Sequence, residues 1–172
     1  MLNQLKEQKD MKLKGGIYHR TQIDLTYNSN RIEGSKLTQE QTRFIFETNT
    51  IGLSKGSMNV DDIIETNNHF WCIDLIIEKA NYKLSESMVK ELYFLLKLGT
   101  LDSGKDWFNV GEYKKFPNEV GGNETSSPEE VSSKMKELLV NYHKKEQKRL
   151  KILLIFTTNL NSFILFRMEM VD

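Results

Sequence analysis

The sequence has 172 residues, the length of one domain, and its 38% hydrophobic and 28% charged residues are typical of a globular chain rather than a disordered one. Lys plus Arg (24) equal Asp plus Glu (24), so bulk charge gives no support for binding nucleic acid or a membrane surface. Cys72 is the single cysteine, which excludes an internal disulfide, and no apolar run has the length of a signal peptide or a membrane span. These features predict a cytoplasmic protein.

The first predicted elements are an N-terminal arm over residues 1–20 and a helix over 22–34. Ser29 and Glu33 are four residues apart, which places both side chains on one face of that helix. Gly34 follows at once, where a helix ends cheaply in the left-handed conformation. The sequence therefore predicts a polar helix end at this point.

Three more helices are predicted before residue 100. Thr38, with glutamine three residues later, forms a capping box for the first. The second begins at Asn59 or Asp61 and runs to about Lys79, with apolar residues on more than one face, which is typical of a central helix packed on several sides. Ser85 caps the third. Inside the central helix, Cys72 is expected to be a packing residue, and four side chains are expected to be largely buried: Ile63, Phe70, Trp71 and Ile77.

Helical periodicity stops between residues 101 and 125. Two aromatic or β-branched runs around turn residues predict a short β-hairpin over 107–125. Ser127, with Pro128 just inside the helix and two glutamates in its first turn, then starts a further helix with apolar residues at strict helical spacing. An apolar segment follows and ends near Phe156.

The order of these elements, with the motif Ser29-Asn30-Arg31-Ile32-Glu33-Gly34, resembles the Fic-domain family. Its members transfer AMP from ATP to hydroxyl side chains of other proteins, and some carry an inhibitory helix that reads serine or threonine, three residues, glutamate, then glycine or asparagine. The resemblance implies an all-α Fic-type domain over 21–156 with one short hairpin and with its C-terminal part missing. It also implies that Ser29, Glu33 and Gly34 hold the enzyme inactive.

In this family the hairpin is the flap, an exposed edge that aligns the target protein by strand addition. The resemblance implies a target that presents a Tyr, Thr or Ser hydroxyl, and ATP with Mg²⁺ as cofactors of the intact protein. Lys114 stands where members often have arginine. The implied target-docking residues are Gly111, Glu112, Tyr113, Lys114, Val120, Gly121 and Gly122.

The family's active-site motif, H-x-F-x-D/E-G-N-G-R-x-x-R, is absent from the sequence, and none of the three histidines begins anything similar. In this motif the histidine is the general base, the acidic residue holds Mg²⁺, and the glycine-rich turn binds the phosphates. We therefore expect no catalytic residue and no metal ligand in this chain, weak binding of ATP and Mg²⁺ at best, and no activity.

The last residues suggest why the motif is absent. In the reading frame that starts at the third base of each codon, the Met168–Glu169 and Met170–Val171 junctions must each encode glycine. The same frame accommodates Ile-His-Pro-Phe-Gln-Asp-Gly-Asn-Gly-Arg, which is the missing motif in its expected place. The hypothesis is a frame slip near Ile155, a frameshifted tail over 157–172 without a defined role, and an early stop.

Two other interpretations remain open. The helical body and the hairpin are also consistent with a protein-binding module that performs no chemistry, or with an unrelated helical regulator. Loss of the family's later helices would expose apolar surface, which favours self-association. Neither interpretation adds a nucleic acid or a membrane as a partner.

Overall fold

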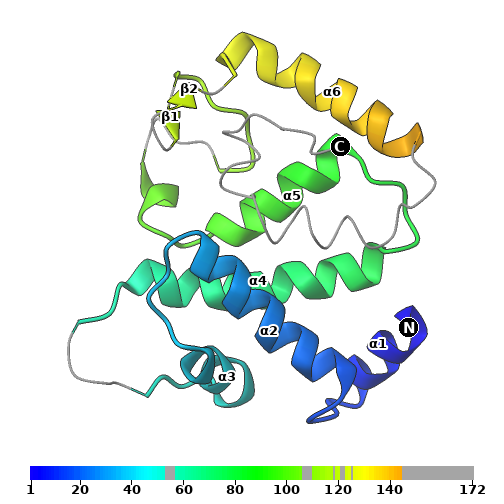
Figure 1. Cartoon of the computed structure of the whole chain (residues 1–172), viewed down its shortest axis with the longest axis vertical. Helices are drawn as coiled ribbons and strands as arrows, with labels where there is room; N and C mark the ends of the chain where they lie inside the picture. Colours follow the sequence, from blue (N-terminus) through cyan, green and yellow to red (C-terminus); the bar gives the residue numbers. More distant parts are fainter. Residues whose placement is uncertain (53–56, 106–109, 118, 121–122, 125, 145–172) are drawn as a thin grey trace.

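The computed structural model describes residues 1–52, 57–105, 110–117, 119–120, 123–124 and 126–144 (Figure 1). Within these ranges the chain is almost wholly helical, with one two-stranded antiparallel sheet. None of the described helices is both long and apolar enough to cross a membrane. The elements in order are α1 (Leu2–Asp10), α2 (Ile17–Ile32), α3 (Gln39–Thr48), α4 (Val60–Lys79), α5 (Glu86–Lys97), the 3₁₀ turn η1 (Asp102–Gly104), β1 (Glu119–Val120), β2 (Asn123–Glu124) and α6 (Pro128–Lys144).

Helix α4 is the centre of the fold. It packs against α1, α2 and α3 on one side and against α5 on the other, and α5 in turn carries α6 (Figure 1). Phe70 and Ile77 are buried at 5% and 3% exposure, and Ile63 is partly buried. The prediction of a central helix covered on several sides is confirmed.

The prediction for Trp71 is wrong, because this side chain is 49% exposed. Successive helical residues point about 100° apart. Its neighbours Phe70 and Cys72 are both buried, on faces that are covered by other helices. Trp71 falls between them on the face that no described helix covers, and apolar character alone could not reveal this.

The N-terminal region is more regular than the sequence predicts. The arm over 1–20 contains α1 and the first turn of α2, which begins at Ile17, five residues before the predicted start at 22. Gly16 stands at the N-cap with no side-chain cap, so the polar start signal that marks other helices is missing. The helix start was therefore difficult to locate from the sequence.

Capping residues fix the starts of the next helices. Thr38 and Gln41 form the predicted capping box: the Thr38 hydroxyl accepts from Gln41 N (3.1 Å) and the Gln41 side chain accepts from Thr38 N (2.9 Å). Asn59, rather than Asp61, caps α4. The Ser85 hydroxyl caps α5 by accepting from the N–H of Met88, the third residue of the helix.

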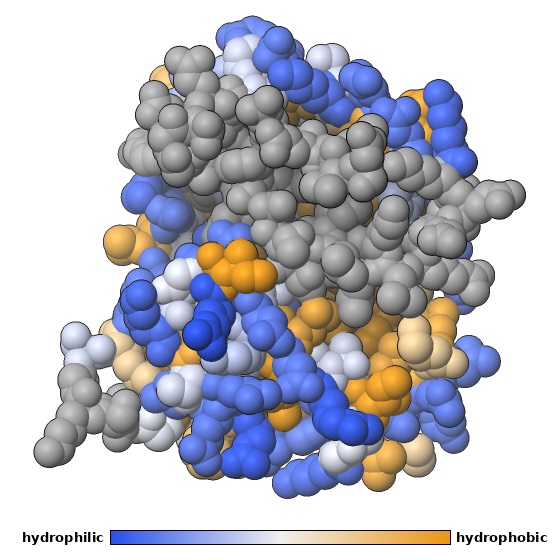
Figure 2. Space-filling model, in the orientation of Figure 1, coloured by the Kyte–Doolittle hydropathy of each residue, from blue (hydrophilic) through white to orange (hydrophobic). Residues whose placement is uncertain are grey.

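Helices α5 and α6 enclose the largest apolar cluster. Leu92 is fully buried, and Val131 and Met135 of α6 are 7% and 4% exposed. In the space-filling view the outer surface of α6 is mostly hydrophilic, as expected for an amphipathic helix with one covered face (Figure 2).

The predicted hairpin is present as a short antiparallel ladder, in which Glu119 pairs with Glu124 and Val120 with Asn123. The structure thus confirms an all-α fold with one short hairpin. Residues 107–109 at the start of the predicted hairpin and the predicted frameshifted tail over 157–172 lie outside the described residues.

Candidate functional site

Helix α2 ends in a Schellman cap at the motif that the sequence singled out. Gly34 has φ +95°, its N–H donates to Arg31 O (3.1 Å), and the N–H of Ser35 donates to Asn30 O (2.9 Å). These two bonds satisfy carbonyls that a helix end otherwise leaves unpaired. A residue other than glycine would be strained at this φ, so the predicted left-handed helix end at Gly34 is confirmed.

The two side chains of the motif have different surroundings. Ser29 is 3% exposed, and its Oγ has no hydrogen-bond partner within the part of the chain that the structure describes. Glu33 lies one turn later at the exposed helix end, where its N–H donates to Ser29 O (3.2 Å). The hydroxyl thus belongs to the interior and the carboxylate to the surface. Their joint role in inhibition stays a prediction.

Both sides of the cap are tied to the first half of α4. Before it, Asn30 Nδ2 donates to Thr66 Oγ1 (2.8 Å), a bond between two buried side chains. After it, the N–H of Lys36 donates to Asp62 Oδ2 (2.9 Å). The cap that holds Glu33 is therefore bonded to α4 at two points, one before it and one after it in the chain.

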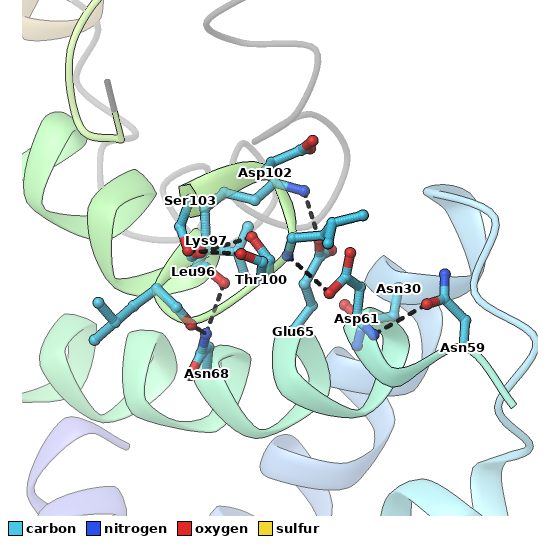
Figure 3. A network of polar contacts seen from close by, with 12 residues as sticks. Asn30, Asn59, Asp61, Glu65, Asn68, Leu96, Lys97, Thr100, Asp102 and Ser103 are labelled. Atoms are coloured by element: carbon cyan, nitrogen blue, oxygen red, sulfur yellow. Dashed lines mark hydrogen bonds and ion pairs between the residues drawn. The ribbon is translucent and has the colours of Figure 1, made fainter. Parts of the chain in front are cut away.

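The same half of α4 is bonded on its other side to the end of α5 and to η1 (Figure 3). Lys97 is 6% exposed and donates to Glu65 Oε1 (2.6 Å). Asp61 Oδ1 accepts from Leu101 N (3.0 Å). Asn68 Nδ2 donates to the carbonyls of the α5 end at 2.9 and 2.8 Å, which the helix itself leaves unpaired. These contacts join the first half of α4 to the α5 end, on a face next to the one that holds the α2 cap.

His69 is the buried histidine of this region. It is 6% exposed, and its Nδ1 lies 3.0 Å from Thr26 Oγ1. Burial lowers the pKa of His69 to about 4, so the ring is neutral at pH 7. A ring enclosed in this way cannot reach the hydroxyl of a target protein. We interpret His69 as a structural residue rather than as a general base.

The described part of the predicted flap begins with a close approach to α5. Gly111 has φ +83°, and a Cβ at this position would lie 3.0 Å from Phe94 Cβ and 3.3 Å from Lys90 O. Only glycine meets both demands without strain. The chain is therefore held against α5 just before the strands begin.

Lys90 of α5 joins the next two flap residues. Its Nζ lies 2.9 Å from Glu112 Oε2 and 4.4 Å from the centre of the Tyr113 ring, a distance at which a cation is attracted to an aromatic face. Tyr113 packs against the α5–α6 cluster, and burial raises the pKa of its hydroxyl. These contacts fix the base of the flap to the helical body.

The remaining flap residues are less enclosed. Lys114 is half-buried, and burial together with Lys134 lowers its pKa. Val120 pairs with Asn123 in the ladder, while Gly121 and Gly122 lie outside the described residues. The flap is positioned by α5 and lies away from the α2 cap, so the structure does not bring the two predicted sites together (Figure 1).

In the family, Mg²⁺–ATP is held by an acidic side chain and a glycine-rich phosphate-binding turn. Across the described ranges, no three His, Cys, Asp or Glu side chains gather where they could hold a metal ion. The glycine-rich phosphate-binding turn of the family is absent from the sequence. Weak binding of ATP and Mg²⁺ stays a prediction, and what the described residues offer is a fixed helix end and an anchored hairpin.

Sequence reasoning missed the polar residues that join α2 to α4. The sequence alone places Thr26 and Asn30 in a polar stretch of helix, yet they are 0% and 8% exposed. Their four-residue spacing was the available signal. The same spacing is equally typical of a solvated helix face, so the partner helix was needed to interpret it.

Comparison with solved structures supports a fold assignment. The chain is similar to the crystal structure of a Fic domain containing signaling protein from Bacteroides thetaiotaomicron, with a TM-score of 0.64 and 22% sequence identity. The similarity covers 95% of this chain and 72% of that one. No family model and no curated protein matches the sequence. At this coverage and TM-score, the chain has a Fic-type fold.

Proposed function

We propose that this chain comes from the lineage of Fic protein AMP-transferases, which transfer AMP from ATP to a hydroxyl side chain of a target protein. In this proposal Ser29, Glu33 and Gly34 form the autoinhibitory motif. The observation that carries it is the Schellman cap at Glu33–Gly34, held on the central helix of a Fic-type fold by the Asn30–Thr66 and Lys36–Asp62 bonds. The two bonds hold the cap at one position on α4, which an inhibitory segment would require.

As printed, the chain is proposed to be inactive. It contains no match to the motif that supplies the general base, the metal carboxylate and the phosphate-binding turn. Loss of a general base alone typically costs 10²–10⁴-fold in rate. The shifted reading frame accommodates the motif from its histidine to its first arginine, which supports a frame slip near Ile155 as the cause. Sequencing the source DNA over codons 150 to 172 tests this, because codons that cannot encode the motif would exclude it.

The activity is tested with a frame-restored protein that carries the motif. Transfer of labelled AMP is measured with and without Glu33→Gly, and Glu129→Gly on the exposed start of α6 serves as the matched control. The proposal expects higher transfer from the Glu33 variant only, because a charge that blocks the phosphate site would be removed. Equal labelling by all three restored forms would show that Ser29–Gly34 is only a helix end.

The complementary measurement is AMP transfer by the 172-residue chain. Glu33→Gly in the 172-residue chain is expected to leave AMP transfer at background, since no catalytic motif is present to be released. Transfer by the unmodified printed chain would contradict the proposed inactivity. If the restored protein neither binds ATP with Mg²⁺ nor labels a target, a binding module without catalysis becomes the better interpretation.

A further inference from the structure

Helices α2 and α4 are joined by a regular series of side-chain hydrogen bonds, here named the α2–α4 ladder. Four α2 side chains spaced four residues apart each bond to α4. The first two share Asp74, and the partners of the next two, His69 and then Thr66, descend in number as the α2 residues ascend. This is the pattern of two antiparallel helices in one fixed register. The pairs are Tyr18 Oη–Asp74 Oδ1 (2.8 Å), Gln22 Nε2–Asp74 Oδ1 (2.8 Å), Thr26 Oγ1–His69 Nδ1 (3.0 Å) and Asn30 Nδ2–Thr66 Oγ1 (2.8 Å).

The middle of the ladder is closed to water. Gln22, Thr26 and Thr66 are each 0% exposed. A buried polar group that loses its partner pays its full desolvation cost, whereas an apolar contact shifts with little loss. Sliding α2 along α4 by one turn would separate Thr26 from His69 and Asn30 from Thr66. Polar contacts inside a helix pair can thus set the register, as single buried polar residues do in coiled coils.

Asn30 connects the ladder to the α2 cap. Its side chain makes the last ladder contact, to Thr66, while its carbonyl accepts the N–H of Ser35 in the Schellman cap (2.9 Å). Ser29 and Glu33 lie on either side of this residue along the helix. The point at which Asn30 of α2 contacts α4 therefore determines where the cap and the Glu33 backbone lie.

We propose that the α2–α4 ladder is a positioning device that sets the location of the Ser29–Gly34 cap on the central helix, with Asn30 and Thr66 as its decisive positioning residues. The ladder's effect on inhibition rests on the proposed function. Its effect on the register of α2 rests only on the contacts described above. The two parts are therefore tested separately.

The register is tested by amide hydrogen exchange in the full 172-residue chain. Thr66→Val removes the Oγ1 acceptor at nearly constant shape and leaves Asn30 Nδ2 unpaired. We expect exchange over residues 26–34 to rise about tenfold, while α5 is unchanged. Thr66→Ser restores the hydroxyl and is expected to bring exchange back to within about twofold of the unmodified chain.

Thr42→Val is the matched control. Thr42 is 1% exposed and its hydroxyl donates to Thr38 O inside α3, so the substitution removes an equally buried hydroxyl outside the ladder. It should leave exchange over 26–34 unchanged. If Thr66→Val does not fold, Thr26→Val removes the contact at His69 and is measured in the same way.

A general rise in exchange across α5 as well as α2 would overturn the proposal, because Thr66 would then be only a packing residue. Failure of Thr66→Ser to restore slow exchange would also overturn it. In the frame-restored protein, Thr66→Val should raise AMP transfer toward the level of Glu33→Gly. If the restored protein shows no transfer in any form, the proposed function fails, while the exchange results still decide whether the ladder positions α2.

Discussion

The two sides of α4 are held by different mixtures of apolar and polar contacts. Toward α5 the centre of the contact is apolar, with Leu92 fully buried and Leu96 6% exposed. The polar bonds of Glu65 and Asn68 lie at the end of α5. Toward α2 the contact is the polar ladder. Apolar burial supplies most of the free energy of folding but little direction, whereas paired polar groups add little net stability and define one geometry. The α5 side therefore stabilises the fold, and the α2 side specifies the position of the candidate inhibitory segment.

The largest effect is expected from a substitution in the apolar cluster between α4 and α5. Leu92→Ala should lower the free energy of unfolding by about 3–5 kcal/mol, because it leaves a cavity at a site with no exposure. Urea unfolding followed by circular dichroism measures this loss. Leu101→Ala is the control, since Leu101 is 76% exposed and should cost less than about 0.5 kcal/mol. Equal effects of the two substitutions would contradict the apolar contact as the main source of stability.

The next largest effect is the loss of stability when acid protonates His69 on the α2 side of α4. The pKa of His69 is lowered to about 4 in the folded chain, below the ordinary value of about 6.5 for an unfolded histidine. The unfolded chain therefore binds the proton first, so the stability from a neutral His69 is complete above pH 6.5 and is lost as the pH falls toward 4. The loss should be roughly 3 kcal/mol at most.

Unfolding measured at several pH values in the unmodified chain and in His69→Gln isolates this contribution. The same comparison removes the contribution of Asp74 to the pH dependence, because Asp74 is present in both proteins. Burial raises the pKa of Asp74, so its protonation favours the folded state as the pH falls. The difference between the two proteins should shrink over pH 6.5 to 4. A difference that does not vary with pH would mean that His69 is accessible to protons in the folded chain.

A smaller effect concerns the outer face of α5, where the base of the flap is attached. Gly111→Ala should cost about 1–3 kcal/mol, because φ is positive and the new Cβ would lie 3.0 Å from Phe94 Cβ. Gly104→Ala is the control, since its Cβ would meet no atom within 4 Å and its φ is not positive. Thermal unfolding of both variants measures the contrast. No loss in Gly111→Ala would show that the flap base is not fixed to α5.

The smallest effect is expected for the reactivity of the Cys72 thiol. Cys72 is 4% exposed on the apolar side, and burial raises the pKa of its thiol to about 12. A thiol reagent should therefore label the folded chain slowly, as predicted for a packing residue. Thr66→Val, which loosens only the polar side, should leave this rate unchanged. Faster labelling in that variant would show that the two sides of α4 open together.

Local signals explain which parts of the fold could be predicted. The caps at Thr38 and Ser85 and the glycine end at Gly34 depend on a few neighbouring residues, so the sequence carries them completely. The exposure of Trp71 and the burial of Thr26 depend on which helix lies opposite, and hydropathy does not encode that. The candidate cap was therefore found from the sequence, and the ladder that holds it was not.

The sequence separation of the ladder contacts has a consequence for folding. Asn30–Thr66 and Tyr18–Asp74 join residues 36 and 56 positions apart, whereas Cys72–Leu92 and Asn68–Leu96 span 20 and 28. Closing a longer loop costs more chain entropy, and local contacts generally form sooner. We expect α4 and α5 to pair early and α2 to dock late onto a surface that already exists. Substitutions in the ladder should then accelerate unfolding and leave the refolding rate almost unchanged.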